Sequence, residues 1–451
     1  MTAPRTPGLP ADVTAGQARR AAVSAFVGAV IEWYDFLIFG LVAATVFNRH
    51  FYAFDSPTMN LLASFATLGI GFLFRPLGGL VFGRMGDRVG QKRVLVVTMT
   101  VMGACTGLVG FLPTYEQIGW WSPVLLTLLR SVQGFAVGGE WGGAALLAVR
   151  HAPAGRRAFY SSGVQIGYAV GLVAASTAVS GMSYLTGDAF EVWGWRVPFW
   201  SSIVLIAVGL WIRAGVVERP KDPAVRAEGE RSSAWAAIRQ RPAVFLEIIG
   251  LRLVELLTMY IVTTFAVAYA DTHLDMPREQ MVNVAAVVGA LGIVSIPLFA
   301  HLSDRVGWRR IYVTGALVAA ACAFPFFRAL ERGSIVLVVL AAVLLINVAH
   351  DMAVSVQQPL ITQMFGAAHQ NTGAGVGYQV ASAVAGGFTP FIATALLAWA
   401  GDAWWPVATY LLLGSLVSAG VAAFVVRTPG APTPGAPGQR EPSPRDPSRA
   451  A

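Results

Sequence analysis

Charged side chains inside long apolar stretches are the residues of this 451-residue chain that could do chemistry. A charge at the centre of a lipid bilayer costs at least about 2.5–3.5 kcal/mol, so such residues are rare unless they are used. The candidates for holding a proton are Glu32, Asp35, Glu255, Asp351 and His350. The candidates for binding an anion are Arg75, Arg130 and Arg252. Together they predict proton transfer combined with recognition of a small charged molecule.

Two spacings bring such charges onto one helix face. Glu32 and Asp35 lie three residues apart, so they share a face, and two close carboxylates favour sharing one proton. The alternatives to proton handling are neutralisation by an arginine and solvation near the membrane surface. Arg252 and Glu255 have the same spacing, which leaves Arg252 two competing roles, as a substrate anchor or as the partner of Asp35 or Glu255.

His350 also has two interpretations. It stands next to Asp351, and an imidazole beside a carboxylate can titrate near neutral pH. A single histidine in a helix is more often a packing residue with satisfied hydrogen bonds.

The composition indicates that all these residues belong to a membrane protein. Hydrophobic residues make up 55% of the chain and charged residues 12%, with a mean hydropathy of +0.61, whereas soluble proteins carry about a quarter charged residues. A soluble enzyme is therefore nearly excluded. No P-loop, HExxH, CxxC or GxSxG pattern occurs, so we expect no enzymatic reaction, no cofactor and no metal site.

Long apolar runs predict an all-α integral membrane protein with twelve transmembrane helices. They fall near residues 21–47, 59–83, 94–112, 122–149, 159–185, 197–215, 243–270, 281–301, 311–328, 334–355, 372–398 and 405–427. The predicted organisation is a cytoplasmic segment 1–20, a six-helix bundle 21–215, a cytoplasmic linker 216–242, a second six-helix bundle 243–427 and a disordered cytoplasmic tail 428–451.

Arginine and lysine set the expected orientation, because short cytoplasmic loops retain positive charge. With the N-terminus inside, 24 of the 32 basic residues fall in cytoplasmic segments and only five fall outside. Both termini are therefore expected in the cytoplasm, in a multi-pass protein of the inner (cytoplasmic) membrane. The net charge of +8 then reflects topology, and we expect no nucleic-acid partner.

A repeated segment indicates two equivalent halves. Residues 82–93 (FGRMGDRVGQKR) recur as residues 299–310 (FAHLSDRVGWRR), an offset of 217 residues. Each copy lies between the second and third helix of its half, so the two halves have the same orientation. The offset also makes Asp35 equivalent to Arg252, and these two could face each other across a central cavity.

Three further motifs accompany the repeat, in residues 31–36 (IEWYDF), 74–79 (FRPLGG) and 130–144 (RSVQGFAVGGEWGGA). With them the sequence resembles the major facilitator superfamily and, within it, the metabolite:proton symporter family, whose members carry shikimate, α-ketoglutarate, citrate, proline or betaine. The chain departs from the family pattern at Arg84 and in residues 350–375. The resemblance implies that helices 1, 4, 7 and 10 line a cavity between two six-helix halves.

The binding and gating candidates follow from these motifs. Besides the three arginines, the candidate substrate-binding residues are Tyr34, Gln133 and Tyr260. The resemblance implies that the two loop motifs latch one conformation on the cytoplasmic side, with simple topological anchoring by their basic residues as the alternative. The candidate gating residues are Gly83, Asp87, Arg88, Gly90, Lys92, Arg93, Glu140, Asp304, Arg305, Arg309 and Arg310.

These features predict a secondary active transporter that takes up a small organic acid or zwitterionic metabolite with protons, by alternating access. The alternatives are a proton-coupled exporter of a small metabolite and a transporter-like sensor that binds without transport. The expected partners are the small-molecule substrate, protons and the lipid bilayer, and the expected functional unit is a monomer.

Overall fold

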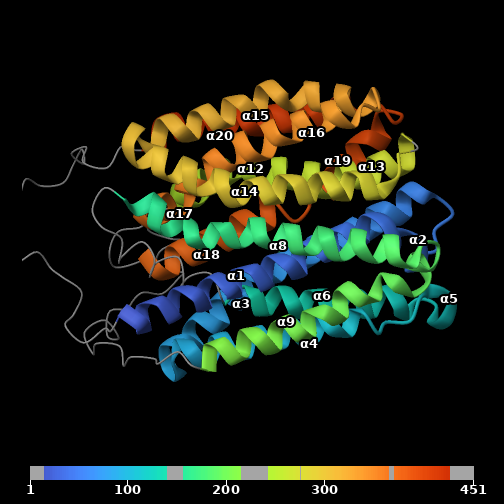
Figure 1. The fold of residues 1–451 in the computed structure, drawn as a ribbon, viewed down its shortest axis with the longest axis horizontal. Helices are drawn as coiled ribbons and strands as arrows, with labels where there is room; N and C mark the ends of the chain where they lie inside the picture. The colour runs from blue at the N-terminus through green and yellow to red at the C-terminus, as the bar shows by residue number, and fades with distance from the viewer. Residues whose placement is uncertain (1–14, 140–155, 215–241, 275, 365–369, 427–451) are drawn as a thin grey trace, which may run out of the picture.

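The computed structural model describes residues 15–139, 156–214, 242–274, 276–364 and 370–426. Within these ranges the chain is helical apart from short connections, and it contains no strand. The long helices run side by side along the long axis of the molecule (Figure 1). The predicted linker 216–242, apart from Pro242, and the predicted tail 428–451 lie outside the described residues. The prediction of an all-α fold is confirmed.

The first half forms six helices at the predicted places. They are α1 (Ala15–Val42), which continues through a π-helical segment (Ala43–Phe47) into α2 (Asn48–His50), then α3 (Pro57–Val89), α4 (Gln91–Val109), α6 (Trp121–Val137), α8 (Arg157–Thr186) and α9 (Arg196–Ala214), the last preceded by a π-helical segment (Phe190–Gly194). A short helix, α5 (Tyr115–Ile118), connects α4 to α6. The first helix begins at Ala15 rather than near residue 21, because the alanine-rich stretch 15–22 favours helix.

The second half repeats this plan. It comprises α12 (Pro242–Tyr260), a π-helical segment (Ile261–Phe265) and α13 (Ala266–His273), then α14 (Arg278–Val306), α15 (Trp308–Glu331), α16 (Ile335–Val343), the π-helical segment η4 (Leu344–His350), α17 (Asp351–Met364), α18 (Gln370–Ala385), α19 (Thr389–Trp399) and α20 (Trp405–Val425). The segments α12 to α13, α16 to α17 and α18 to α19 each correspond to one predicted span.

Nine helices in the described ranges are long and apolar enough to cross a membrane. Of the other three predicted spans, α4 is a shorter apolar helix, and α6 ends close to residue 140, where the description stops. The third, the α12 span, carries Glu247, Arg252 and Glu255. Exposed tryptophans, typical of a membrane interface, lie near α5 and α19, at the same end of the bundle as α2 (Figure 1).

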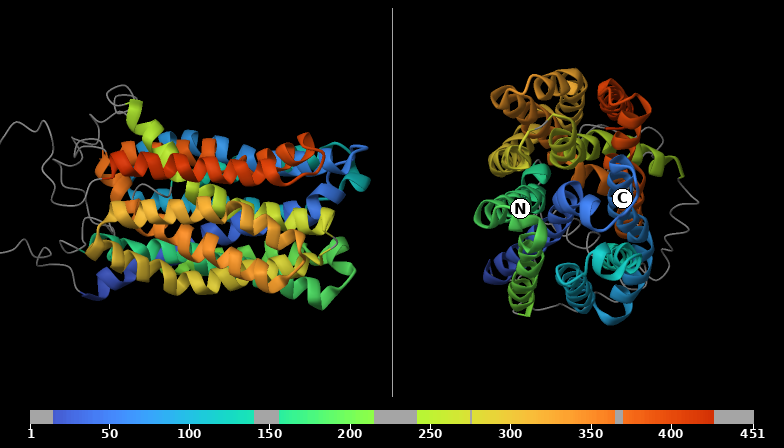
Figure 2. Two further views of the ribbon diagram at one scale, coloured as in Figure 1. Left: turned by 90° about the horizontal axis from the view of Figure 1, so that it is seen from above. Right: turned by 90° about the vertical axis from the view of Figure 1, so that its right-hand side faces the viewer.

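The two halves meet along two sets of helices. Helix α8 of the first half packs on α14 of the second, and α3 packs on α18 and α19. Figure 1 shows α12, α14, α15 and α20 on one side and α4, α6 and α9 on the other, with α8 between them, and Figure 2 shows the bundle from two further directions. A site shared by both halves must therefore lie next to these contacts.

The 217-residue repeat is also present in the backbone. Gly90 joins α3 to α4 with a φ of 100°, and Gly307 joins α14 to α15 with a φ of 106°. Residues other than glycine rarely adopt these φ angles, which explains why a glycine recurs at this place in both halves. The π-helical segments 43–47 and 261–265 likewise occupy nearly equivalent places in the two halves.

Helices α3 and α6 touch backbone to backbone through glycines. A Cβ atom on Gly134 would lie 1.8 Å from the carbonyl oxygen of Gly71, and one on Gly138 would lie 2.0 Å from that of Arg75. Small residues at four-residue spacing allow this approach in a membrane. The contact places Arg75 on α3 beside Arg130 on α6, because a Cβ atom on Gly71 would itself meet the Arg130 side chain.

We expect Gly134→Ala to destabilise the folded protein, because the added methyl group has no room against Gly71. Overpacking of this kind costs about 1–3 kcal/mol. The matched control is Gly163→Ala on α8, where no atom lies within 4 Å of an added Cβ and helix propensity improves by up to about 1 kcal/mol. Unfolding temperatures in detergent give the comparison, and equal stability of the two variants would contradict the close contact.

Candidate functional site

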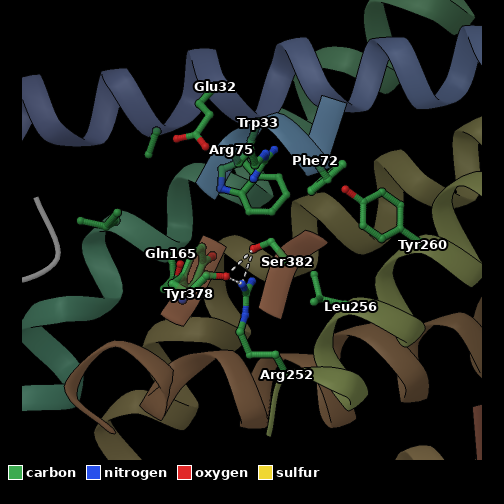
Figure 3. A pocket seen from close by; sticks show the side chains of 12 residues that line it. Glu32, Trp33, Phe72, Arg75, Gln165, Arg252, Leu256, Tyr260, Tyr378 and Ser382 are labelled. Carbon is green, nitrogen blue, oxygen red and sulfur yellow. Dashed lines mark hydrogen bonds between the residues drawn. The ribbon is translucent and has the colours of Figure 1, made fainter. Parts of the chain in front are cut away.

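A small cavity lies between the halves, with walls from both of them (Figure 3). Its lining residues are Ala29, Glu32 and Trp33 of α1, Phe72 and Arg75 of α3, Val164 and Gln165 of α8, Arg252, Leu256 and Tyr260 of α12, and Tyr378 and Ser382 of α18. The cavity volume is about 30 Å³, which holds one or two water molecules rather than a metabolite. In this conformation the cavity is too small for a metabolite, which can bind only after the cavity widens.

Arg75 is the cation of the first half that reaches this cavity. Its side chain is buried, and its guanidinium carbon lies 4.0 Å from the ring centre of Phe36 and 3.9 Å from that of Phe72. The Nε atom is buried without a hydrogen-bond partner. Glu32 extends into the same space from α1 (Figure 3). Aromatic faces stabilise the positive charge while leaving a donor available for a ligand.

Arg252, the cation of the second half, is held by its own neighbours. Its Nε and Nη2 atoms donate to the two carboxylate oxygens of Glu255 at 3.2 Å and 3.1 Å. Its Nη1 atom donates to the carbonyl oxygen of Tyr378 at 2.8 Å and to the hydroxyl of Ser382 (Figure 3). Glu255 also accepts from Gln357. Of the two roles considered for Arg252, the structure shows the ion-pair partner of Glu255.

Asp35 and Arg130 belong to a relay inside the first half. The Asp35 carboxylate accepts from Ser202 at 2.7 Å and from Thr106 at 2.9 Å. Thr106 accepts from Gln133 at 2.8 Å, and Gln133 accepts from Arg130 at 2.7 Å. The Arg130 guanidinium also lies over the rings at positions 36 and 39, at 4.2 Å and 4.3 Å. Two neutral side chains thus connect the buried Asp35 carboxylate to the buried Arg130 guanidinium.

This arrangement corrects one expectation. Asp35 does not face Arg252 across the cavity, because its carboxylate lies against α4 and α9 while Arg252 bonds to α18 and to its own helix. Of the two acids on α1, Glu32 lines the cavity, whereas Asp35 does not.

Of the remaining substrate-binding candidates, one lines the cavity and three do not. Tyr260 lines the cavity, with its ring centre 5.9 Å from that of Phe72. Tyr34 lies outside it, because its hydroxyl donates to the carbonyl oxygen of Pro198 at 2.8 Å and contacts the hydroxyl of Ser201 at 2.6 Å. Arg130 and Gln133 do not line this cavity.

The candidates His350 and Asp351 lie together in the second half. The Nδ1 atom of His350 is 2.9 Å from an Asp351 oxygen, and both side chains are buried. They stand at the junction of η4 and α17 and do not line the cavity.

One loop motif joins the halves at the end of the bundle marked by α17. The Asp304 carboxylate accepts from the backbone amides of Ala158 and Phe159, at 3.2 Å and 3.0 Å, in the first turn of α8. A carboxylate suits a helix N-terminus, where free N–H groups and the helix dipole favour negative charge. The basic candidates Arg93, Arg305, Arg309 and Arg310 are exposed.

The other gating candidates are less informative. Gly83 is exposed with open space around it, and Gly90 shapes the turn described above. The side chains of Asp87, Arg88 and Lys92, and the whole of Glu140, lie outside the described residues.

A second connection between the halves, at the α2 end, is absent from the sequence-based candidates. Arg49 lies 2.7 Å from Glu191 and 2.6 Å from Asp271, and Arg278 lies 2.6 Å from Glu191. Arg49 and Glu191 belong to the first half, Asp271 and Arg278 to the second. In the sequence Arg49 and Arg278 count only as basic residues of outer loops. The acids Glu191 and Asp271, near the ends of neighbouring predicted helices, are the signal that could have revealed the ion pairs.

Comparison with known proteins extends these observations. Residues 25–390 match the Major Facilitator Superfamily. The chain is 54% identical over 411 residues to the shikimate transporter of Escherichia coli, covering 90% of this chain and 94% of that protein. It is 29% identical over 431 residues to the proline/betaine transporter of Salmonella typhimurium, covering 92% and 85%. A partially occluded inward-open structure of the xylose transporter XylE from E. coli has a TM-score of 0.70 at 16% identity, covering 89% of this chain and 97% of that one.

The helical fold, with a cavity shared by two halves, defines a multi-pass membrane transporter. The chain belongs to the Major Facilitator Superfamily, as the loop repeat and the helix motifs predict. Its relatives include shikimate, proline/betaine and other metabolite transporters, which confirms the prediction of a transport protein that is not an enzyme. The twelve-helix fold class is confirmed with the family.

We expect Glu191→Gln to favour opening of the α2 end, because it removes the charge that pairs with Arg278 of the other half. An ion pair near the surface contributes up to about 1 kcal/mol, so the cavity should open up to about fivefold more often. The measurement is the labelling rate of Leu256→Cys, a cavity residue, in detergent-solubilised protein that carries Cys105→Ser and Cys322→Ser.

The matched control is Glu331→Gln, which breaks an exposed ion pair with Arg328 within one half. Equal labelling rates in the Glu191→Gln and Glu331→Gln proteins would show that the α2-end ion pairs do not hold the cavity closed.

Proposed function

We propose that this chain is a proton-coupled symporter that takes up a small cyclic hydroxy acid of the shikimate kind. The observation that carries the substrate class is the 54% identity to the shikimate transporter, which extends over 90% of the chain. A cavity with arginines on two sides, each contributed by one half, supports the assignment to an anion. Alternating access then consists of opening this cavity first to one side of the membrane and then to the other.

Arg75 is the proposed anchor for the substrate carboxylate. Arg252 is already matched by Glu255 and two further acceptors, whereas the Arg75 Nε donor has no acceptor. Arginine binds a carboxylate through two parallel hydrogen bonds, and burial strengthens such bonds. The substrate would supply negative charge and acceptors where the pocket offers donors.

The rest of the cavity suits a ring that carries hydroxyl groups. Trp33, Phe72 and Tyr260 offer aromatic surface for the apolar faces of a ring. Glu32 and Gln165 offer acceptors and a donor for hydroxyl groups. This combination of one anchor cation, aromatic walls and a few polar groups is typical of small-molecule sites.

Proton coupling is supported by the buried acids of the spans. An acid in an apolar bundle is costly unless it is paired or protonated, so a transported proton can be held there. We also place both termini in the cytoplasm, on the distribution of basic residues, so that the α2 end faces outward. A monomer is the proposed functional unit, because the two halves of one chain enclose the cavity.

We expect proteoliposomes with an acidic exterior to accumulate labelled shikimate, and a protonophore to abolish the accumulation. Citrate, proline and betaine complete the panel. Preferential accumulation of betaine would reassign the substrate to the zwitterions, to which the aromatic walls also offer a binding surface. Gradient-driven movement in the export direction alone would indicate an exporter, and binding without transport would indicate a sensor.

We expect Arg75→Lys to raise the KM for shikimate about tenfold or more, because lysine cannot form the bidentate pair. The matched control is Arg84→Lys, a change at an exposed position on the same helix, which should leave KM unchanged. Concentration series of initial uptake rates give both values. A KM equal to that of the wild type in Arg75→Lys would place the carboxylate elsewhere.

A further inference from the structure

The buried acids of the spans differ in how their charge is matched. Glu255 has the Arg252 guanidinium directly against it, so that pair is neutral. Asp35 connects to a guanidinium through a relay of neutral groups. Asp351 has neither arrangement.

Asp351 is completely buried and bonds to three side chains. One carboxylate oxygen lies 2.9 Å from Nδ1 of His350. The other accepts from Nδ2 of Asn347, at 3.2 Å, and from the hydroxyl of Ser295 on α14. In the part of the chain that the structure describes, no arginine or lysine contacts Asp351.

The charge of this dyad therefore depends on one proton. With an ionised carboxylate and a neutral imidazole, His350 and Asp351 together carry one negative charge. One added proton makes the pair neutral, whether it resides on the carboxyl group or on the ring. A net charge inside an apolar bundle is costly unless it is matched.

Helices α8, α12, α14, α15 and α18 pack against the segments that carry the dyad, and α18 brings Tyr378. Helix α12 brings the neutral Arg252–Glu255 pair, α15 brings Tyr312, whose hydroxyl donates to the carbonyl oxygen of Leu251, and α8 brings Tyr168. The residue contacting Asp351 from α14 is Ser295, which does not titrate. None of these supplies an unmatched charge to replace the proton.

Tyr168 connects the dyad to the cavity wall and to the other half. Its ring centre lies 5.0 Å from that of His350 and 5.1 Å from that of Trp33, which lines the cavity. Its hydroxyl is buried without a hydrogen-bond partner. Three residues earlier on α8, Gln165 lines the cavity and donates to Gln357 of α17 at 3.3 Å.

We propose that the His350–Asp351 dyad takes up the transported proton, and that Tyr168 positions the imidazole and makes its protonation sensitive to the contact between the halves. The inference rests on the proposed symport function. The dyad accepts one proton from the side to which the cavity is open and returns it to the other side. The dyad stands at the end of a π-helical segment, a local geometry that recurs at functional sites.

Asp35 is the competing site, and its position argues for a different role. It bonds to α4 and α9 of its own half, so its protonation would change contacts within that half. The dyad instead contacts α8 across the interface at which the halves must separate. Protonation there acts directly on the moving contact.

The test uses the full chain in proteoliposomes with labelled shikimate and two measurements. Counterflow exchanges substrate without net proton movement, whereas accumulation requires the pH gradient. Asp351→Asn should retain counterflow within about twofold and lose about tenfold or more of the gradient-driven accumulation. The matched control is Ser355→Ala on α17, which removes a buried hydroxyl bonded to its own helix and should retain both.

Tyr168 is tested through the pH profile. Tyr168→Phe keeps the ring and should keep the pH of half-maximal uptake, whereas Tyr168→Leu should shift it by roughly one pH unit. A purely structural role would lower activity in Tyr168→Leu without moving the profile, and that result would overturn the positioning role.

The outcomes separate this inference from the proposed function. Accumulation retained in Asp351→Asn but lost in Asp35→Asn would move the proton site to the first helix and leave symport intact. If Asp351→Asn loses both activities, His350→Gln decides, because an unchanged pH profile of counterflow in that variant would overturn the dyad. Absence of gradient-driven uptake by the wild type would refute the proposed function and this inference with it.

Discussion

Neutralising charge inside an apolar bundle is the constraint on which the rest of this structure depends. Three buried guanidinium groups meet it in two ways. Arg252 is matched by a carboxylate and carbonyl and hydroxyl acceptors, whereas Arg75 and Arg130 both lie over the ring of Phe36, at 4.0 Å and 4.2 Å. An aromatic face stabilises a cation less completely than a carboxylate does and leaves N–H groups unused. The arginines of the first half therefore retain capacity for an external anion, and Arg75 is the one that reaches the cavity.

The glycine contacts between α3 and α6 make this arrangement possible. The backbones approach so closely that a Cβ atom on Gly134 would lie 1.8 Å from a carbonyl oxygen of the neighbouring helix. At this separation the side chains of Arg75 and Arg130 share their surroundings, and both guanidinium groups lie over the ring of Phe36 of α1. Local sequence thus determines helix spacing, helix spacing determines the electrostatics, and the electrostatics determine which cation is available to bind.

The fold was accessible from sequence, whereas much of the site was not. Apolar runs predict the spans, and the repeated segment is predicted between the second and third helix of each half, where the chain turns at Gly90 and Gly307. Glu32 and Asp35 show the limit. A three-residue spacing leaves about 60° between two side chains, and that angle is enough for one carboxylate to enter the cavity while the other bonds to Thr106 and Ser202. Which face turns inward is decided by packing between distant segments, as is the pairing of Arg49 with Glu191, 142 residues away.

The same electrostatic constraint explains how a substrate and a proton could move only together. A bound carboxylate brings one negative charge next to Arg75, and a proton on the dyad brings one positive charge, so the doubly loaded protein has the net charge of the empty one. Loading with either alone leaves an unmatched charge in a region where a single charge costs several kcal/mol. The halves must also separate in turn at each end, the α2 end by breaking the Arg49–Asp271 and Arg278–Glu191 ion pairs and the α17 end by releasing Asp304 from the amides of α8. Breaking these contacts already costs free energy, so an additional unmatched charge inside the bundle would make the conformational change still less favourable. The fully loaded and the fully empty forms are therefore the two that can change from one open side to the other.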